Sequence, residues 1–251
     1  MSASAADAQT IAHPKSFLMA SSAAHMTPQE RTSSFSLASI FALRMFGLFI
    51  ILPVFAVYAR ELPGGDSETL VGITLGIYGL TQGLLQIPFG VASDRLGRKP
   101  VIIFGLIIFA LGSFLAASGA NIWIVMLGRM LQGAGAISAA VTAFIADSVR
   151  VQVLTKAMAM VGASIGLTFA LSLLISPPLT KLWGVSGLFT LTGISALIAV
   201  LVVKFVVPPE PQSAIDEKNE HRSWRKVVCD PQLVRLNIGI FVLHAVLTAI
   251  F

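Results

Sequence analysis

The stretch "GVASDRLGRKP", residues 90–100, separates two long apolar segments and carries one acid and three bases. Charged residues make up only 12% of the 251-residue chain, so this cluster needs an explanation. Gly97 and Pro100 favour a turn, and clustered bases are typical of short cytoplasmic loops in membrane proteins. Asp94 is different, because an acid at a helix C-terminus meets the negative end of the macrodipole. Arg98, one turn later, is its nearest partner, so the stretch is either a plain topogenic loop or a conformational latch.

Most of the chain is apolar enough to lie in a lipid bilayer. Hydrophobic residues make up 55% of the sequence, more than the core of a small soluble domain accommodates. A helix needs about 20 mostly apolar residues to cross the hydrocarbon layer. The complete runs that approach or exceed this length are 36–58, 69–91, 101–118, 122–146, 157–178 and 182–206, and a seventh begins near Arg235. The sequence therefore predicts an all-α membrane protein.

The basic residues predict the orientation of these spans. With a cytoplasmic N-terminus, 13 of the 17 Lys and Arg residues lie on the cytoplasmic side, as the positive-inside rule requires. Only Arg60 and Lys181 then lie outside, while Arg44 and Arg129 lie within spans. The net charge of +5 is thus explained by topology, and no nucleic-acid partner is expected.

Composition divides the chain into four segments. Residues 1–34 are rich in small and polar residues, lack a secretory signal, and are predicted to be a disordered cytoplasmic tail. Residues 35–207 hold the six-helix transmembrane bundle, 208–234 form a polar cytoplasmic linker, and 235–251 begin a truncated seventh transmembrane helix. Six spans, a long linker and a new span are typical of transporters built from two bundles, in which each bundle is a 3+3 inverted repeat.

Six residues of the opening stretch follow the pattern G-x-x-x-D-R-x-G-R-K: Gly90, Asp94, Arg95, Gly97, Arg98 and Lys99. On this motif the chain resembles the major facilitator superfamily, although Ala92 replaces the usual Leu. The resemblance implies the fold of that family, with a loop that packs against the other half-bundle and stabilises one state of an alternating-access cycle. From Met26 onward the chain resembles the YajR-type bacterial carriers, which are grouped with drug–proton antiporters. That resemblance implies a multi-pass protein of the bacterial cytoplasmic (inner) membrane.

A second group of polar residues lies within "LGRMLQGAGAISAA", residues 127–140. Arg129 lies inside the fourth span, where an arginine costs about 2.5–3.5 kcal/mol on insertion scales. It either extends to the outer interface near Trp123 or has a functional role. The run Arg129-x-x-Gln132-Gly133 resembles the family's fourth-span motif, which implies that Arg129 and Gln132 face the central cavity and take part in substrate binding or coupling.

Further polar residues are placed at or near the same spans. Asp147, at the cytoplasmic end of the fourth span, repeats the unusual placement of Asp94. The sequence predicts either an Asp94–Arg98–Asp147 cluster or a solvated helix end. Arg44, in the first span, either extends to the cytoplasmic interface or faces the cavity. Two polar residues one turn apart in the second span are expected to line the cavity: Gln82 and Gln86.

The residue inventory favours a gradient-driven transporter. There is no Walker loop, no metal-ligand cluster and no Ser–His–acid arrangement, so no enzyme activity, cofactor or metal is expected. The six spans have no carboxylate in their interiors, and the fifth has Leu167 where the antiporter motif has Pro.

The predicted function is alternating-access efflux of an unidentified small molecule or drug, with protons as the candidate coupling ion. The alternatives are a metabolite or sugar facilitator without proton coupling and a non-transporting half. The expected partners are membrane lipid and a C-terminal half-bundle.

Overall fold

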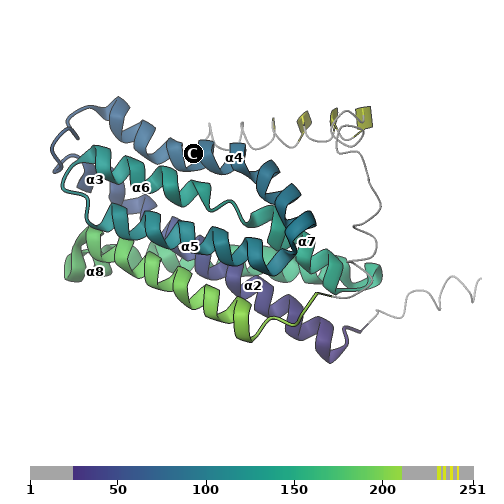
Figure 1. Cartoon of the computed structure of the whole chain (residues 1–251). Helices are drawn as coiled ribbons and strands as arrows, with labels where there is room; N and C mark the ends of the chain where they lie inside the picture. The colour runs from purple at the N-terminus through teal and green to yellow at the C-terminus, as the bar shows by residue number, and fades with distance from the viewer. Residues whose placement is uncertain (1–24, 211–230, 233, 236–237, 240–241, 243–251) are drawn as a thin grey trace, which may run out of the picture. The chain divides into compact units, whose positions relative to one another are not determined.

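A computed structural model describes residues 25–210, 231–232, 234–235, 238–239 and 242 (Figure 1). The described residues contain α-helices and turns and no strand. The chain divides after Glu210 into two compact units. The described helices of the first unit are α2 (Pro28–Phe49), α3 (Leu52–Ala59), α4 (Glu68–Leu96), α5 (Arg98–Ala117), α6 (Ile122–Ala134), α7 (Ser138–Ser148) and α8 (Val151–Phe205).

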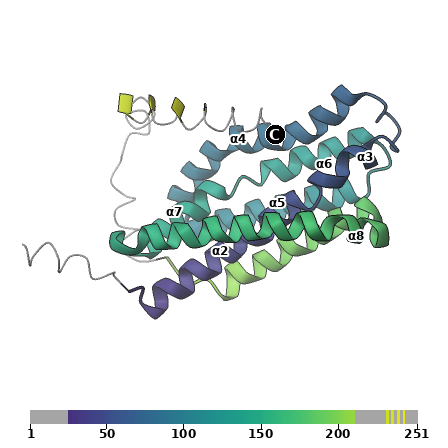
Figure 2. The same cartoon turned by 180° about the vertical axis from the view of Figure 1, so that it is seen from behind.

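The predicted all-α membrane architecture is confirmed. Within the described part of the chain, the segments long and apolar enough to cross a membrane are Pro28–Ala59, Glu68–Leu96, Arg98–Ala117, Ile122–Ser148 and Val151–Phe205. The last of these, α8, contains both the fifth and the sixth predicted span. Its two arms fold back on each other at Gly184, where φ is 65° and ψ is 178° (Figure 2). Glycine adopts this left-handed φ without the steric cost that a Cβ would bring.

Two of the predicted spans are interrupted, which the continuous apolar runs did not indicate. The first span is divided into α2 and α3 at residues 50–51, and Pro53 lies in the first turn of α3, where its missing N–H is tolerated. The fourth span is divided into α6 and α7 at residues 135–137. A Cβ on Gly135 would collide with the carbonyl oxygen of Gly105 in α5, so the chain at this break lies against the α5 backbone.

The first helix starts earlier than its apolar run. Thr27 and Glu30 form a capping box: the backbone N of Glu30 donates to Thr27 Oγ1 at 3.2 Å, and the backbone N of Thr27 donates to Glu30 Oε2 at 2.8 Å. The predicted boundary of the tail at residue 34 is therefore wrong, because polar capping extends α2 back to Pro28. Residues 1–24, most of the predicted linker and most of the seventh helix lie outside the described residues, so that part of the domain division stays a prediction.

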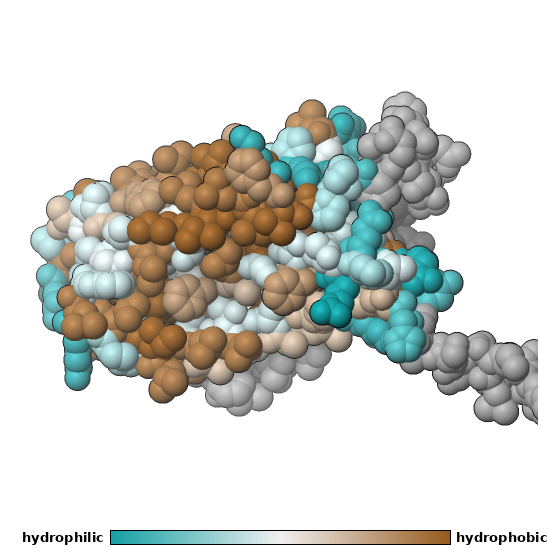
Figure 3. Space-filling model, turned by 90° about the horizontal axis from the view of Figure 1, so that it is seen from below, coloured by the Kyte–Doolittle hydropathy of each residue, from teal (hydrophilic) through white to brown (hydrophobic). Residues whose placement is uncertain are grey.

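The interior of the first unit is apolar, and so is much of its outer surface. Its largest buried cluster joins α2, α5, α7 and both arms of α8, through side chains such as Leu37, Ile102, Phe144 and Val153. Figure 3 shows a broad apolar surface between more polar ends. A membrane covers such a band, because water would leave this much apolar area unfavourably hydrated.

Candidate functional site

Arg98 joins three helices at one end of the bundle. Its Nη1 lies 2.6 Å from Oδ1 of Asp94 in the last turn of α4, and its Nε donates to Oδ2 of Asp147 in α7 at 2.9 Å. Nη1 also donates to Oγ of Ser93 at 2.8 Å. The Arg98 side chain is 8% exposed, that of Asp147 22% and that of Asp94 55%, so the contact with Asp147 is better shielded from water. The residues predicted to cluster thus lie in contact, while their role as a latch stays a prediction.

The other residues of the predicted latch lie around this ion-pair cluster. Gly97 ends α4 with φ 95° and ψ 152°, a conformation that explains why glycine occupies the turn. Lys99 donates from Nζ to the carbonyl oxygen of Val207. Gly90 faces α7, where an added Cβ would lie 3.8 Å from that of Ala139. Arg95 is exposed to solvent.

Glu210 is a member of this corner that the sequence did not reveal. Its Oε1 accepts a hydrogen bond from the backbone N of Arg98, the first residue of α5. A carboxylate is favourable there because the N-terminus of a helix carries a partial positive charge. Sequence analysis assigned Glu210 to the linker, and no local pattern pairs it with a residue 112 positions away.

Arg44 is the centre of a polar network inside the bundle. Its guanidinium donates from Nη1 to Ser138 Oγ at 3.1 Å, and from Nη2 to Gln82 Oε1 at 3.0 Å and to the carbonyl oxygen of Gly135 at 3.4 Å. It also lies 5.7 Å from the ring centroid of Phe109. The side chain is 1% exposed, so of the two alternatives left open by the sequence, extension to the membrane interface is excluded, and a role in the cavity stays a prediction.

Arg129 has a separate set of partners. Its Nη1 donates to Gln132 Oε1 at 3.0 Å, and Gln132 Nε2 in turn donates to Ser113 Oγ at 2.8 Å. The guanidinium lies over Tyr78, with 4.7 Å between its carbon and the ring centroid. Gly133 lies where a Cβ would collide with the carbonyl oxygen of Tyr78, so α6 and α4 approach backbone to backbone.

Arg129 and Gln132, which were expected to face the central cavity, are fully buried between helices of the described bundle, and their role in substrate binding or coupling stays a prediction. Gln82 and Gln86 are half-buried, and the Oε1 atom of Gln86 is buried without a hydrogen-bond partner. The Nε atoms of Arg44 and Arg129 are likewise buried and unpartnered. Among the residues that the structure describes, neither arginine forms an ion pair with a carboxylate.

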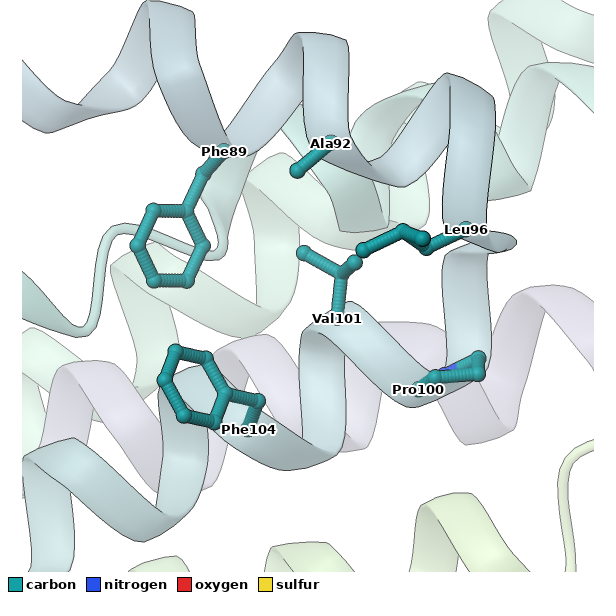
Figure 4. Close-up of a pocket in the computed structure, with 6 residues that line it drawn as sticks. All are labelled: Phe89, Ala92, Leu96, Pro100, Val101 and Phe104. Atoms are coloured by element: carbon teal, nitrogen blue, oxygen red, sulfur yellow. The ribbon is translucent and has the colours of Figure 1, made fainter.

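An apolar pocket of about 320 Å³ lies beside the ion-pair cluster, between α4 and α5 (Figure 4). Stacked rings of Phe89 and Phe104, with centroids 6.2 Å apart, close one side of it. Ala92 points into the space from α4. The small side chain at the position where the family motif usually has Leu therefore leaves room in this hairpin.

Residues 37–251 match the sequence profile described as the Major Facilitator Superfamily. The chain belongs to this superfamily. It is 45% identical over 228 residues to the inner membrane transport protein YajR of Escherichia coli K12, a match covering 90% of this chain and 50% of that protein. It is also 35% identical over 127 residues to the class B tetracycline resistance protein of Escherichia coli, covering 50% of this chain and 32% of that one. Both the predicted superfamily and the predicted YajR-like character are confirmed.

Structural comparison gives the same major facilitator fold. The solved POT family transporter PepTSo matches with a TM-score of 0.62 at 17% identity, over 75% of this chain and 40% of that one. The chain spans about half the length of the curated relatives that it matches over most of its own length. This major facilitator chain is thus a multi-pass protein of the bacterial inner membrane, from a family of transporters.

Proposed function

We propose that this chain works as one six-helix bundle of a secondary transporter that exports small molecules by alternating access. The observation that carries the proposal is the Asp94–Arg98–Asp147 cluster, which holds α4, α5 and α7 together at one end of the bundle. The more exposed pair with Asp94 contributes less than about 1 kcal/mol, and the better shielded pair with Asp147 about 1–3 kcal/mol. Contacts of that size shift an equilibrium between two conformations without making either state permanent, which suits a latch that must open in each cycle.

The proposal includes a second bundle packed against this one. Small residues let transmembrane helices approach closely, and glycines on α4 and α8 have no described atom near the place of a Cβ: Gly72, Gly76, Gly79, Gly83, Gly162 and Gly166. The matches cover only 50% and 56% of the first two curated relatives, so both are longer than this chain. We therefore assign these glycine faces to contact with a C-terminal bundle, and place the N-terminus and the charged cluster on the cytoplasmic side by the positive-inside rule.

The proposed substrates are drug-like molecules, and protons are the proposed coupling ion. Resistance proteins among the relatives support export, including multidrug resistance protein 1 of Bacillus subtilis, which is 29% identical over 187 residues. A facilitator without proton coupling is the second candidate. It is favoured by the buried arginines, which have no carboxylate partner among the described residues, because proton coupling needs a titratable group at membrane depth.

The test joins this chain to the C-terminal bundle of Escherichia coli YajR and reconstitutes the chimera in liposomes with ethidium and tetracycline as probes. We expect an imposed pH gradient to drive a probe above its equilibrium concentration, and Asp147→Asn to slow this flux. The matched control is Arg60→Gln, which removes an ion pair to Glu68 in which both side chains are exposed. Flux that only equalises the probe concentration would support the facilitator, and no flux of either probe would overturn the transport proposal for these substrates.

A further inference from the structure

We propose that Arg44 is a positioning residue of the transport cycle: it holds both sides of the break in the fourth span and thereby links the charged cluster to the interior of the bundle. This inference rests on the proposed alternating-access function. It assigns a specific role to a buried arginine that no family motif explains.

The guanidinium of Arg44 contacts both sides of the break in the fourth span and one residue of α4. The break at residues 135–137 frees backbone groups that, at membrane depth, must find partners within the protein. Arg44 donates to the carbonyl oxygen of Gly135 on the α6 side and to the hydroxyl of Ser138, the first residue of α7. Its bond to Gln82 anchors the same group to α4. A planar guanidinium with five donors suits such a bridge, whereas a lysine ammonium presents its donors from a single atom.

The helix α7 is short and is contacted by an arginine at each end. Arg44 contacts Ser138 at its start, and Arg98 pairs with Asp147 in its last turn. At a rise of 1.5 Å per residue, the 11 residues of α7 span about 16 Å. Each 10° of tilt about the break would therefore move the Asp147 end by about 3 Å.

The helix α6 meets its neighbours backbone to backbone, whereas α7 approaches α4 less closely. A Cβ on Gly128 would lie 2.7 Å from the carbonyl oxygen of Gly112, and one on Gly133 would collide with that of Tyr78, so α6 lies against the backbones of α5 and α4. At Gly90 in α4, an added Cβ would lie 3.8 Å from that of Ala139 in α7, so the two helices leave room for a side chain there. Close-packed elements shift as units, so motion released at Asp147 is concentrated in α7 and absorbed at the break.

These contacts give a physical route from the charged cluster to the interior. When the Arg98–Asp147 pair opens, α7 tilts about residues 135–137, and the Ser138 hydroxyl moves relative to the guanidinium of Arg44. Because the same guanidinium binds Gln82, the change reaches α4, where Gln82 is expected to line the cavity. Arg44 thus couples the state of the ion pair to the side chains around the transport path.

The test measures the position of α7 directly. Spin labels are attached at Ala146→Cys in α7 and Leu127→Cys in α6, both exposed positions, in a Cys229→Ser background of the full chain in lipid nanodiscs. Pulsed electron resonance then gives the distance distribution between them. We expect one narrow distribution for the parent, and a shift of about 3 Å or a clear broadening for Asp147→Asn and for Arg44→Gln. Arg44→Lys should not restore the parent distribution.

Arg129→Gln is the matched control, because it removes an equally buried arginine of α6 whose partners, among the described residues, are Gln132 in α6 and Tyr78 in α4. It should leave the distribution unchanged. If Arg44→Gln does not fold, Ser138→Ala removes only the α7 side of the bridge and should broaden the distribution in the same direction. A parent-like distribution in the Arg44 or Ser138 variant, or equal broadening in Arg129→Gln, would overturn the inference. Since the distance needs no substrate, failure of transport alone would refute only the proposed function.

Discussion

The Nε atom of Arg98 lies 2.9 Å from Oδ2 of Asp147, and this pair connects the start of α5 to the end of α7. Arg98 lies at the N-terminus of α5, where a cation meets the positive end of the helix macrodipole. Asp147 lies near the C-terminus of α7, where an acid meets the negative end. Both placements are unfavourable for an isolated charge. Each partner relieves the unfavourable placement of the other. The ion pair therefore stabilises the conformation in which α5 and α7 are in contact. When the pair opens, both charges are left at unfavourable helix ends.

The two acids that contact Arg98 are predicted to differ in their contribution to stability. Asp147→Asn should lower the free energy of unfolding by about 1–3 kcal/mol, because its contact is largely shielded from water. Asp94→Asn should cost less than about 1 kcal/mol, since this carboxylate is more than half exposed. Thermal unfolding in detergent micelles measures both, and Arg98→Gln completes a double-mutant cycle. If Asp147→Asn and Asp94→Asn lowered the free energy of unfolding equally, the larger contribution assigned to Asp147 would be contradicted.

Gly135 should tolerate no side chain. Gly135→Ala places a Cβ against the carbonyl oxygen of Gly105, and overpacking of this kind costs about 1–3 kcal/mol. The matched control is Gly83→Ala, where no described atom lies within 4 Å of the added carbon, and which should be neutral or stabilising by about 0.5–1 kcal/mol. The melting temperatures of the two variants in the same detergent test this, and a stable Gly135→Ala protein would argue against close contact at the break.

Filling the pocket between α4 and α5 should stabilise the bundle. Ala92→Leu adds three carbons to an apolar space of about 320 Å³, with an expected gain of up to about 1 kcal/mol from van der Waals contacts, since lipid or detergent removes most of the hydrophobic driving force. Ala170→Leu adds the same atoms at an exposed position of α8 and should change the melting temperature little. A lower melting temperature for Ala92→Leu would show that the pocket cannot accept the side chain.

Glu30 should stabilise the start of α2 through two kinds of contact. Its carboxylate completes the capping box with Thr27 and accepts from Nε of Arg150 at 2.8 Å. Glu30→Gln weakens both, so we expect a loss of about 1–2 kcal/mol on thermal unfolding. Glu68→Gln removes an exposed carboxylate that also pairs with an arginine, and should have almost no effect. Similar losses in both variants would contradict a special role for the buried carboxylate.

The sequence indicated the Asp94–Arg98–Asp147 cluster well, because the signals for it are local. Asp94 and Arg98 are one helical turn apart, and the repeated placement of acids at helix ends pointed to Asp147. The interior network was not indicated in the same way. Arg44 and Ser138 are 94 positions apart, and a buried arginine has the same sequence signal as one that extends to the interface. Side-chain burial depends on which helices meet, and hydropathy does not contain that information.

By itself, the sequence determined the apolar spans, the charged turn between α4 and α5, and the membership in the major facilitator superfamily. These follow from composition, spacing and motif, which are properties of short segments. Only the tertiary structure decided that the first and fourth spans are broken, that α2 begins at a capping box before its apolar run, and that Arg44 holds the second break. The physical reason is that a break in a membrane helix persists only where distant groups satisfy its backbone, and packing alone brings those groups together.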